Sequence, residues 1–242
     1  MPSCVYAMVL AVVVALAPLA ACSPETSSAE LPAAAEAVDG KSDAGDAAAD
    51  VAPEPPEPAT PAGPDPNWPI KPYEDPHAVI TMVGGAQVVV DLEKEFAPKT
   101  VENFIRLAEQ KFYDGTVFHR VIPGFMAQGG SPDGQGADGP GWTIDLEIHP
   151  SLRHVRGSMA MARKPDPNSA GSQFYICYAP KSQLDDQYAV FGTVKSGMDA
   201  VDDFKYGSTN PSEMRRQGWD APEAGYPSTI ESVRIVDGPP SS

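Results

Sequence analysis

The passage that decides the fold reads FHRVIPGFMAQGG, from Phe118 to Gly130. β-Branched and aromatic residues flank Pro123-Gly124, a pair typical of a turn, so the passage predicts a strand, a turn and a second strand. Successive strand residues point to opposite faces of a sheet, so residues two apart share a face. One such unit can present the cation of Arg120, an apolar wall and the amide of Gln128 to a single groove.

The segments around this passage predict a mainly β domain. Short apolar runs separated by Gly, Pro, Asp and Asn predict strands at 78–82, 86–92, 117–122, 142–146, 159–162, 173–178, 189–194 and 229–236. Pro98 suits a first helical turn, and the apolar spacing that follows it predicts a helix, with a second short helix at 198–204. Many short strands with only two helices indicate a barrel or a sandwich rather than an alternating α/β fold.

The amino-terminal segment reads as an export signal. Residues 5–21 are uncharged and apolar but too few for a comfortable membrane span, as in the core of a signal peptide. Leu19-Ala20-Ala21-Cys22 resembles the lipobox of bacterial lipoproteins, in which the cysteine is lipidated and becomes the new terminus. We therefore expect a signal peptide at 1–22, a lipid on Cys22 and an extracytoplasmic protein on the cell envelope, periplasmic in a diderm host. Ser23 would then direct it to the outer membrane. The alternative is an ordinary signal peptide with a chance cysteine.

Residues 23–77 predict a disordered acidic tether. They are rich in Ala, Pro, Glu, Asp and Ser, with almost no large apolar side chain before Trp68. Such a segment cannot bury enough apolar surface to offset the entropy lost on ordering. The whole chain has 33 acidic and 17 basic residues and a net charge of −16. A surface this acidic repels phosphate, so nucleic acid is excluded as a partner, and the membrane is expected to be reached through the lipid alone.

The passage at 118–130 closely resembles the signature of the cyclophilins, a family of peptidyl-prolyl cis–trans isomerases. Residues 171–177 (GSQFYIC) resemble the family's second motif, and 184–194 (LDDQYAVFGTV) resemble its third. The resemblance covers roughly residues 78–237. It implies a closed eight-stranded antiparallel barrel, capped by two helices, with a substrate groove on its outside. We expect this domain at 78–238, preceded by the disordered tether.

The resemblance also implies a mechanism. Rotation about an X–Pro amide faces a barrier of roughly 18–20 kcal/mol, because it breaks amide resonance. The prolyl nitrogen gains a basic lone pair in the twisted state, so a donor near it stabilises that state more than either planar state. Arg120 matches the family's catalytic arginine, and its guanidinium stays charged and offers donors in a fixed fork. Gln128 would hold the substrate carbonyl, which makes these two residues the expected catalytic pair.

The remaining site residues follow from the same resemblance. The expected substrate-binding residues are Phe125, Met126, Ala162, Arg163, Tyr175, Leu184 and Tyr188. Tyr175 stands where the family more often has Phe, and Arg163 where it usually has Asn. Tyr188 and Gln183 replace a frequent His and Trp, so the rim of the groove is altered.

No cofactor and no metal site are expected. The three cysteines, Cys4, Cys22 and Cys177, offer no disulfide framework, and Cys177 is predicted to be a buried small side chain. His77, His149 and His154 lack a metal-ligand spacing, and the loop at 133–139 lacks the terminal acidic ligand of a calcium loop. His119 could suggest a general base, but isomerisation transfers no proton to a nucleophile, so we favour a structural role.

Two classes of function remain open. The first is a peptidyl-prolyl cis–trans isomerase that acts on unfolded or partly folded proline-containing polypeptides outside the cytoplasm. The second is a binding or chaperone module that captures such segments with little turnover. The intact passage from Arg120 to Gln128 favours the enzyme, whereas the altered rim at Arg163, Gln183 and Tyr188 favours the module. A structural lipoprotein with a vestigial barrel is a third and more distant possibility.

Overall fold

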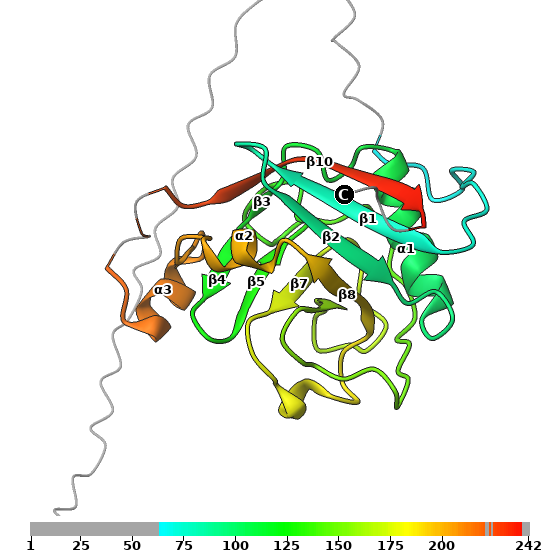
Figure 1. The fold of residues 1–242 in the computed structure, drawn as a ribbon. Coiled ribbons are helices and arrows are strands. Elements are labelled where there is room, and N and C mark those ends of the chain that lie inside the picture. Colours follow the sequence, from blue (N-terminus) through cyan, green and yellow to red (C-terminus); the bar gives the residue numbers. More distant parts are fainter. Residues whose placement is uncertain (1–62, 221–222, 224, 239–242) are drawn as a thin grey trace, which may run out of the picture. The chain divides into compact units, whose positions relative to one another are not determined.

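A computed structural model describes residues 63–220, 223 and 225–238, and these form a mainly β fold (Figure 1). The predicted signal peptide, Cys22 and the linker up to residue 62 lie outside the described residues. The strands are β1 (Pro76–Met82), β2 (Gln87–Leu92), β3 (Val117–Phe118), β4 (Arg120–Ile122), β5 (Met126–Gly129), β6 (Ser158–Met161), β7 (Phe174–Cys177), β8 (Val190–Ser196), β9 (Gly207–Ser208) and β10 (Ser228–Asp237). The helices are α1 (Pro98–Glu109), α2 (Met198–Asp202), α3 (Pro211–Gln217) and the 3₁₀ turn η1 (Ser182–Leu184).

The sheet is a curled half-barrel, and the expected closed eight-stranded barrel is wrong. Ten strands pair in the order β3-β10-β1-β2-β8-β6-β7-β5-β4-β9, which leaves β3 and β9 as two ends. The strand pairs β1–β10, β1–β2, β5–β7 and β6–β7 are antiparallel, as predicted. The ring stays open where the chain passes from β3 to β4, because β3 pairs with β10 while β4 pairs with β5 and β9. There Val117 faces Ser131 through one isolated bridge instead of a ladder.

The helices follow the sequence pattern in part. α1 begins at Pro98, as predicted, and turns Val101, Phe104 and Ile105 toward the sheet. The second predicted helix is present but ends at Asp202, two residues early. The predicted strand at 142–146 is wrong, because this segment is a loop whose one β-bridge, Ile144 with Ala170, is isolated from the ladders of the sheet.

α3 was not predicted. The Asn210 side chain caps it by accepting a hydrogen bond from the Ser212 backbone, Pro211 occupies the first turn, and Gly218 ends it in the left-handed conformation. These three residues are the usual boundary signals of a helix. The segment at 210–226 lacks a helical apolar period, so its sequence pattern alone does not predict a helix.

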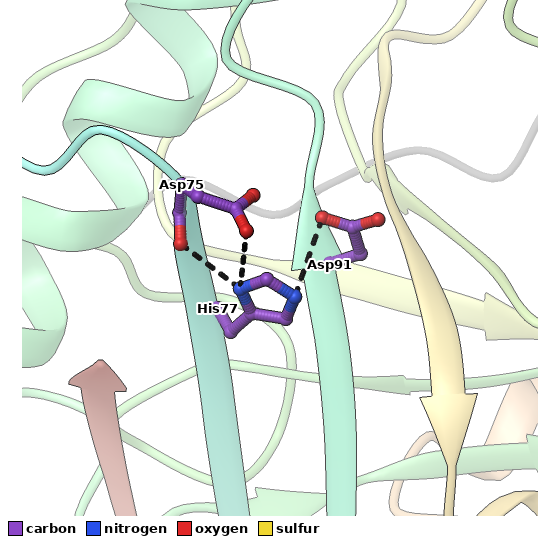
Figure 2. A group of neighbouring side chains, drawn as sticks. All are labelled: Asp75, His77 and Asp91. Atoms are coloured by element: carbon purple, nitrogen blue, oxygen red, sulfur yellow. Dashed lines mark hydrogen bonds and ion pairs between the residues drawn. The ribbon is translucent and has the colours of Figure 1, made fainter. Parts of the chain in front are cut away.

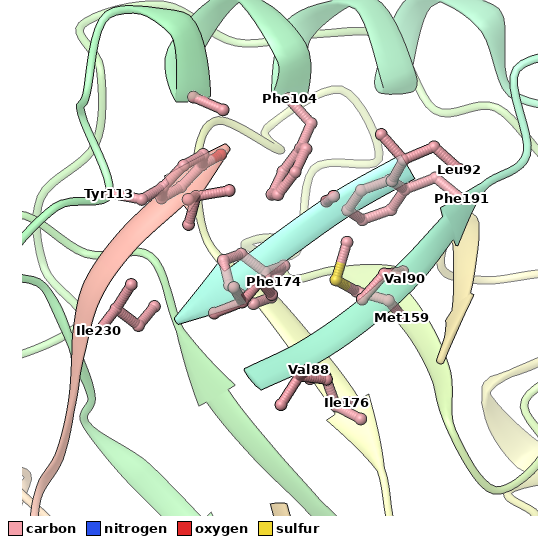
Figure 3. Packing of buried hydrophobic residues seen from close by; sticks show 14 of the residues in the cluster. Val88, Val90, Leu92, Phe104, Tyr113, Met159, Phe174, Ile176, Phe191 and Ile230 are labelled. Atoms are coloured by element: carbon pink, nitrogen blue, oxygen red, sulfur yellow. The ribbon is translucent and has the colours of Figure 1, made fainter. Parts of the chain in front are cut away.

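The core lies between α1 and the concave face of the sheet (Figure 3). Phe104 of α1 stands at its centre, with ring centroids 4.9 Å from Tyr113, 5.7 Å from Phe174 and 5.4 Å from Phe191. Such aromatic pairs each contribute about 0.5–1.5 kcal/mol beyond the area they bury. The cluster therefore fixes β7, which carries Phe174 inward, and so fixes whatever β7 carries on its other face.

Residues 63–75, which composition assigns to the linker, lie against α1. The Asp65 amide donates to the Gln110 side chain at 2.6 Å, and the Tyr73 hydroxyl donates to Glu109 at 2.8 Å. Arg106 donates to the Trp68 carbonyl at 3.2 Å. The folded domain thus begins before residue 78, the predicted start, and β1 itself begins at Pro76. Among the described residues, none forms a helix that is long and apolar enough to cross a membrane.

Candidate functional site

The candidate site lies on the face of the sheet opposite the core. Strand alternation sends Phe174 and Ile176 of β7 into the main core, and Tyr175 and Cys177 into a second, smaller apolar cluster. β4, β5 and β6 alternate in the same way. The second cluster consists of Ile122, Met126, Ala160, Tyr175, Cys177 and Val190. Cys177 is buried, as predicted, and burial raises the pKa of its thiol.

A pocket of about 180 Å³ opens over this second cluster. Its lining residues are Arg120, Phe125, Met126, Gln128, Ala162, Arg163, Tyr175, Leu184 and Tyr188. These are the nine residues that the sequence assigned to catalysis and substrate binding, and they come from four separate segments of the chain. The geometry brings all of them together, while the role of each stays a prediction. A larger hollow of about 340 Å³ adjoins the pocket and shares Gln128, Ala162 and Arg163 with it.

Arg120 lies at the lip of the pocket with its side chain 27% exposed. It faces Gln128 across the β4–β5 ladder, and its Nη1 lies 3.4 Å from the Gln128 Oε1. The guanidinium carbon is 5.9 Å from the centre of the Phe125 ring. Gln128 in turn donates to the Gln173 side chain at 3.0 Å. The cation and the amide are therefore held side by side at one edge of an apolar pocket.

Glu213 of α3 holds the other side of Arg120, and sequence reasoning missed it. Its carboxylate accepts from Arg120 Nη2 at 3.0 Å, and the Glu213 side chain is only 3% exposed. Burial alone raises the pKa of Glu213, but hydrogen bonds from Gln217 and Arg120, with the nearby arginine charges, bring it below its usual value. The capping residues of α3 announce a helix, yet no local signal in the sequence relates Glu213 to a residue 93 positions away.

The hydroxyl of Tyr175 makes a hydrogen bond within the protein, away from the pocket. It lies 2.9 Å from Nε2 of the buried His154, whose Nδ1 lies 2.8 Å from an Asp185 carboxylate oxygen. The His154 backbone amide also donates to Asp185, and this bond is the main reason why the pKa of Asp185 is lowered. Burial raises the pKa of Tyr175. Tyr175 therefore presents its aromatic ring to the pocket while its hydroxyl is already hydrogen-bonded, so this wall of the pocket is apolar.

Arg163 forms the rim of the pocket. Its guanidinium carbon lies 4.7 Å from the centre of the Tyr188 ring, and it donates to the carbonyls of Gln187, Lys164 and Pro165. These contacts fix a cation between the pocket and the larger hollow. Gln183 lies in η1 and is not among the residues that line the pocket.

His119 is buried beside the groove and does not line it. Its side chain lies under the loop at 131–138, where a Cβ on Gly136 would come within 2.8 Å of Nε2. Burial lowers the pKa of His119 to about 4, despite the opposing charge of Asp133. The ring is thus neutral at neutral pH, and its place in the interior is consistent with a structural role.

One group of side chains has the composition of a metal site (Figure 2). His77 lies between Asp75 and Asp91, a grouping that spacing in the sequence did not suggest. The His77 Nδ1 donates to the Asp75 carbonyl at 2.9 Å, and Lys195 pairs with Asp91 at 2.7 Å. The protein's own groups therefore account for these contacts, and the cluster does not require a cation.

Comparison with known proteins agrees with this geometry. Residues 78–223 match the family model described as cyclophilin type peptidyl-prolyl cis-trans isomerase/CLD. Peptidyl-prolyl cis-trans isomerase B of Bacillus subtilis is 42% identical over 135 residues, which cover 55% of this chain and 93% of that protein. A peptidyl-prolyl cis-trans isomerase of Helicobacter pylori is 39% identical over 149 residues, covering 57% and 91% of the two chains.

A solved structure resembles the fold as well. The Cryptosporidium parvum cyclophilin, crystallised in the presence of the dipeptide Ala-Pro, superposes with a TM-score of 0.58 and 30% identity. The match covers 67% of this chain and 99% of that one. The pattern of motifs, the curled sheet with its outer pocket and these similarities lead to one conclusion: the chain belongs to the family of cyclophilin-type peptidyl-prolyl cis–trans isomerases.

Proposed function

We propose that this isomerase accelerates rotation about X–Pro bonds in exported polypeptides, and that Arg120 stabilises the twisted amide. Membership of the family makes the chain a peptidyl-prolyl cis–trans isomerase. The observation that carries the mechanism is the placement of a fixed guanidinium at the lip of an apolar pocket. A proline ring seated in that pocket would bring its nitrogen toward Arg120. A donor there favours the twisted state, in which the nitrogen lone pair is free to accept.

The other lining residues fit the same substrate. Phe125, Met126 and Leu184 offer the apolar surface that a proline ring requires. Gln128 lies beside the guanidinium and would hold the carbonyl that precedes the ring as it turns. The adjoining hollow extends the groove along the backbone at Ala162 and Arg163, so it suits a longer peptide. The related Cryptosporidium protein was crystallised with Ala-Pro, a ligand of this chemical class.

Replacing Arg120 by Ala tests the mechanism. The loss of a charge-assisted hydrogen bond worth about 1.5–3 kcal/mol predicts a fall in kcat/KM of roughly ten- to a hundredfold. The assay is isomerisation of a short proline peptide. Arg234→Ala is the matched control, because Arg234 also pairs with a carboxylate, Asp114, at 2.8 Å but lies outside the groove. A folded Arg120→Ala protein with wild-type kcat/KM would rule out the catalytic role.

The second candidate is a proline-peptide binding or chaperone module with little turnover. The altered rim favours it, since Arg163 adds a fixed cation where the groove meets the larger hollow. A binding titration and an isomerisation assay on the same proline peptide separate the two functions. A module would bind a proline peptide without speeding its isomerisation, whereas an enzyme would do both.

We further propose that the protein works outside the cytoplasm, attached to the cell envelope by a lipid on Cys22. This proposal rests on residues 1–22, whose apolar run and final Leu-Ala-Ala-Cys have the composition of a lipoprotein signal. Its clients would be unfolded or partly folded proline-containing chains, and the enzyme would need no cofactor. Cys22→Ser removes the thiol to which the lipid is attached, so it should release the protein from the membrane fraction. Unchanged fractionation of that variant would contradict the anchor.

A further inference from the structure

α3 brings a carboxylate to the back of Arg120. The helix lies in the segment between β9 and β10 and is delimited by the Asn210 cap and by Gly218. Within it, Glu213 and Met214 are buried while the neighbouring residues are exposed. The helix therefore points one acidic and one apolar side chain inward, at the place where β9 pairs with β4.

The contacts of Glu213 divide between its two oxygens. Oε1 accepts from Arg120 Nη2 at 3.0 Å and from the Gln217 side chain at 2.9 Å. Oε2 is bonded to Arg216, whose side chain is 69% exposed. A carboxylate this deeply buried needs charged or donor partners, because burying it unpaired costs several kcal/mol. Of its two arginine partners, Arg120 is the less exposed, at 27% against 69% for Arg216.

The pairing limits how the guanidinium can point. The group is planar, so the bond from Nη2 to Glu213 restricts its orientation to those in which Nη1 points away from α3. In the structure Nη1 lies 3.4 Å from the Gln128 Oε1 and 3.9 Å from the Met126 sulfur. Those two residues line the pocket. Without Glu213, a partly exposed arginine would sample several rotamers, only some of which face a bound proline. A preorganised donor is worth more to catalysis than a mobile one.

We propose that Glu213 is a positioning residue for Arg120: by holding Nη2 from behind, it aims the rest of the guanidinium into the proline pocket. This inference rests on the proposed function, in which Arg120 acts on the rotating bond. The carboxylate also offsets part of the positive charge, so a purely electrostatic account predicts the opposite result, a faster enzyme once Glu213 is neutralised. The two accounts are therefore separable.

The main test is Glu213→Gln, which keeps the shape of the side chain and removes its charge. We expect kcat for a proline peptide to fall about tenfold or more, since misplacing a catalytic group by as little as 1 Å can cost about a hundredfold. KM should change less than about twofold, because Arg120 acts mainly on the twisted state. Asp114→Asn is the control: it neutralises another ion-paired carboxylate, the partner of Arg234, away from the groove.

The decisive comparison repeats Glu213→Gln in an Arg120→Ala background. A residue that acts through Arg120 should cause no further loss there, whereas a general structural defect would lower kcat by the same factor in both backgrounds. Glu213→Asp keeps a buried carboxylate but draws it back by one methylene, so we expect an intermediate kcat. It also serves as the second variant if Glu213→Gln does not fold.

Several results would overturn the inference. They are wild-type kcat in folded Glu213→Gln, a raised kcat, an undiminished loss in the Arg120→Ala background, or wild-type kcat in folded Glu213→Asp. If the wild-type protein itself is inactive, the proposed function fails and this inference fails with it. An active wild type whose kcat depends on Arg120 but not on Glu213 overturns the inference alone.

Discussion

His119 should make the stability of the protein depend on pH in the mildly acidic range. Burial lowers its pKa from 6.5 to about 4 in the folded protein. Between these two values the unfolded chain takes up a proton that the folded protein refuses, so stability is lost as pH falls. Each unit of difference corresponds to about 1.36 kcal/mol, so the full loss below pH 4 is roughly 3 kcal/mol. From pH 7 to pH 5 the expected loss is about 2 kcal/mol.

Urea unfolding at pH 7 and pH 5 measures this effect. The variant His119→Gln cannot take up the proton, so its free energy of unfolding should fall by about 2 kcal/mol less than that of the wild type over this interval. His149→Gln is the control, because it removes a histidine that stacks on Phe96 at 4.6 Å and lies outside the buried set. It should keep the wild-type difference. Equal pH dependence of the free energy of unfolding in wild type and His119→Gln would refute the reasoning, because protonation of His119 would then not contribute to the loss of stability.

Three further predictions follow from single contacts. Tyr175→Phe should keep isomerase activity, because the aromatic ring remains. It should lower the free energy of unfolding by about 1–3 kcal/mol, because the buried Nε2 of His154 loses its partner; the peptide assay measures the first effect and chemical denaturation the second. Gly197→Ala should lower the free energy of unfolding by more than about 2 kcal/mol, because its Cβ would overlap the Gln87 carbonyl of β2. Gly115→Ala, which has a similar positive φ but open space around it, is the control and should cost less by calorimetry. Arg163→Ala should raise KM several-fold with little change in kcat, because on the proposed function the rim would contact the peptide beside the rotating bond. A comparable fall in kcat would instead give Arg163 a role in the isomerisation step.

The pocket could be predicted from the sequence to the extent that its residues follow local rules. The Pro123-Gly124 turn and the period of two predicted that Arg120 and Gln128 face a single groove, and both line the pocket. That they lie directly opposite each other across β4 and β5 is a finding of the structure. The apolar and aromatic walls of the pocket were inferred from the resemblance to a family, because Tyr175 taken alone is more often an ordinary core residue. In the structure Tyr175 is 5% exposed and lines the pocket, so burial in an apolar cluster and a place in the pocket wall are compatible.

Long-range pairing set the limit of prediction. The closed barrel was inferred from the family, whereas the order of strands depends on pairs such as β2 with β8, which are about a hundred residues apart and carry no local signal. Residues 63–75 were assigned to the linker because their composition is polar. Hydrogen bonds hold them to α1, as at Trp68, and to Gln110 just after it, as at Asp65; composition does not reveal such bonds. The pair of Arg120 and Glu213 was missed for the same reason.

On the proposed role of Glu213, the short α3 gives the enzyme a way to lose activity without global unfolding. A helix of seven residues is not stable alone and depends on packing, here mainly of Met214, which is 8% exposed. Segments with few buried contacts open locally at a lower free energy than the whole protein. If Glu213 aims Arg120, each such opening releases the guanidinium while α1 and the sheet stay intact. Heating would then abolish turnover before the sheet melts, and amide hydrogens of α3 would exchange with solvent faster than those of β7.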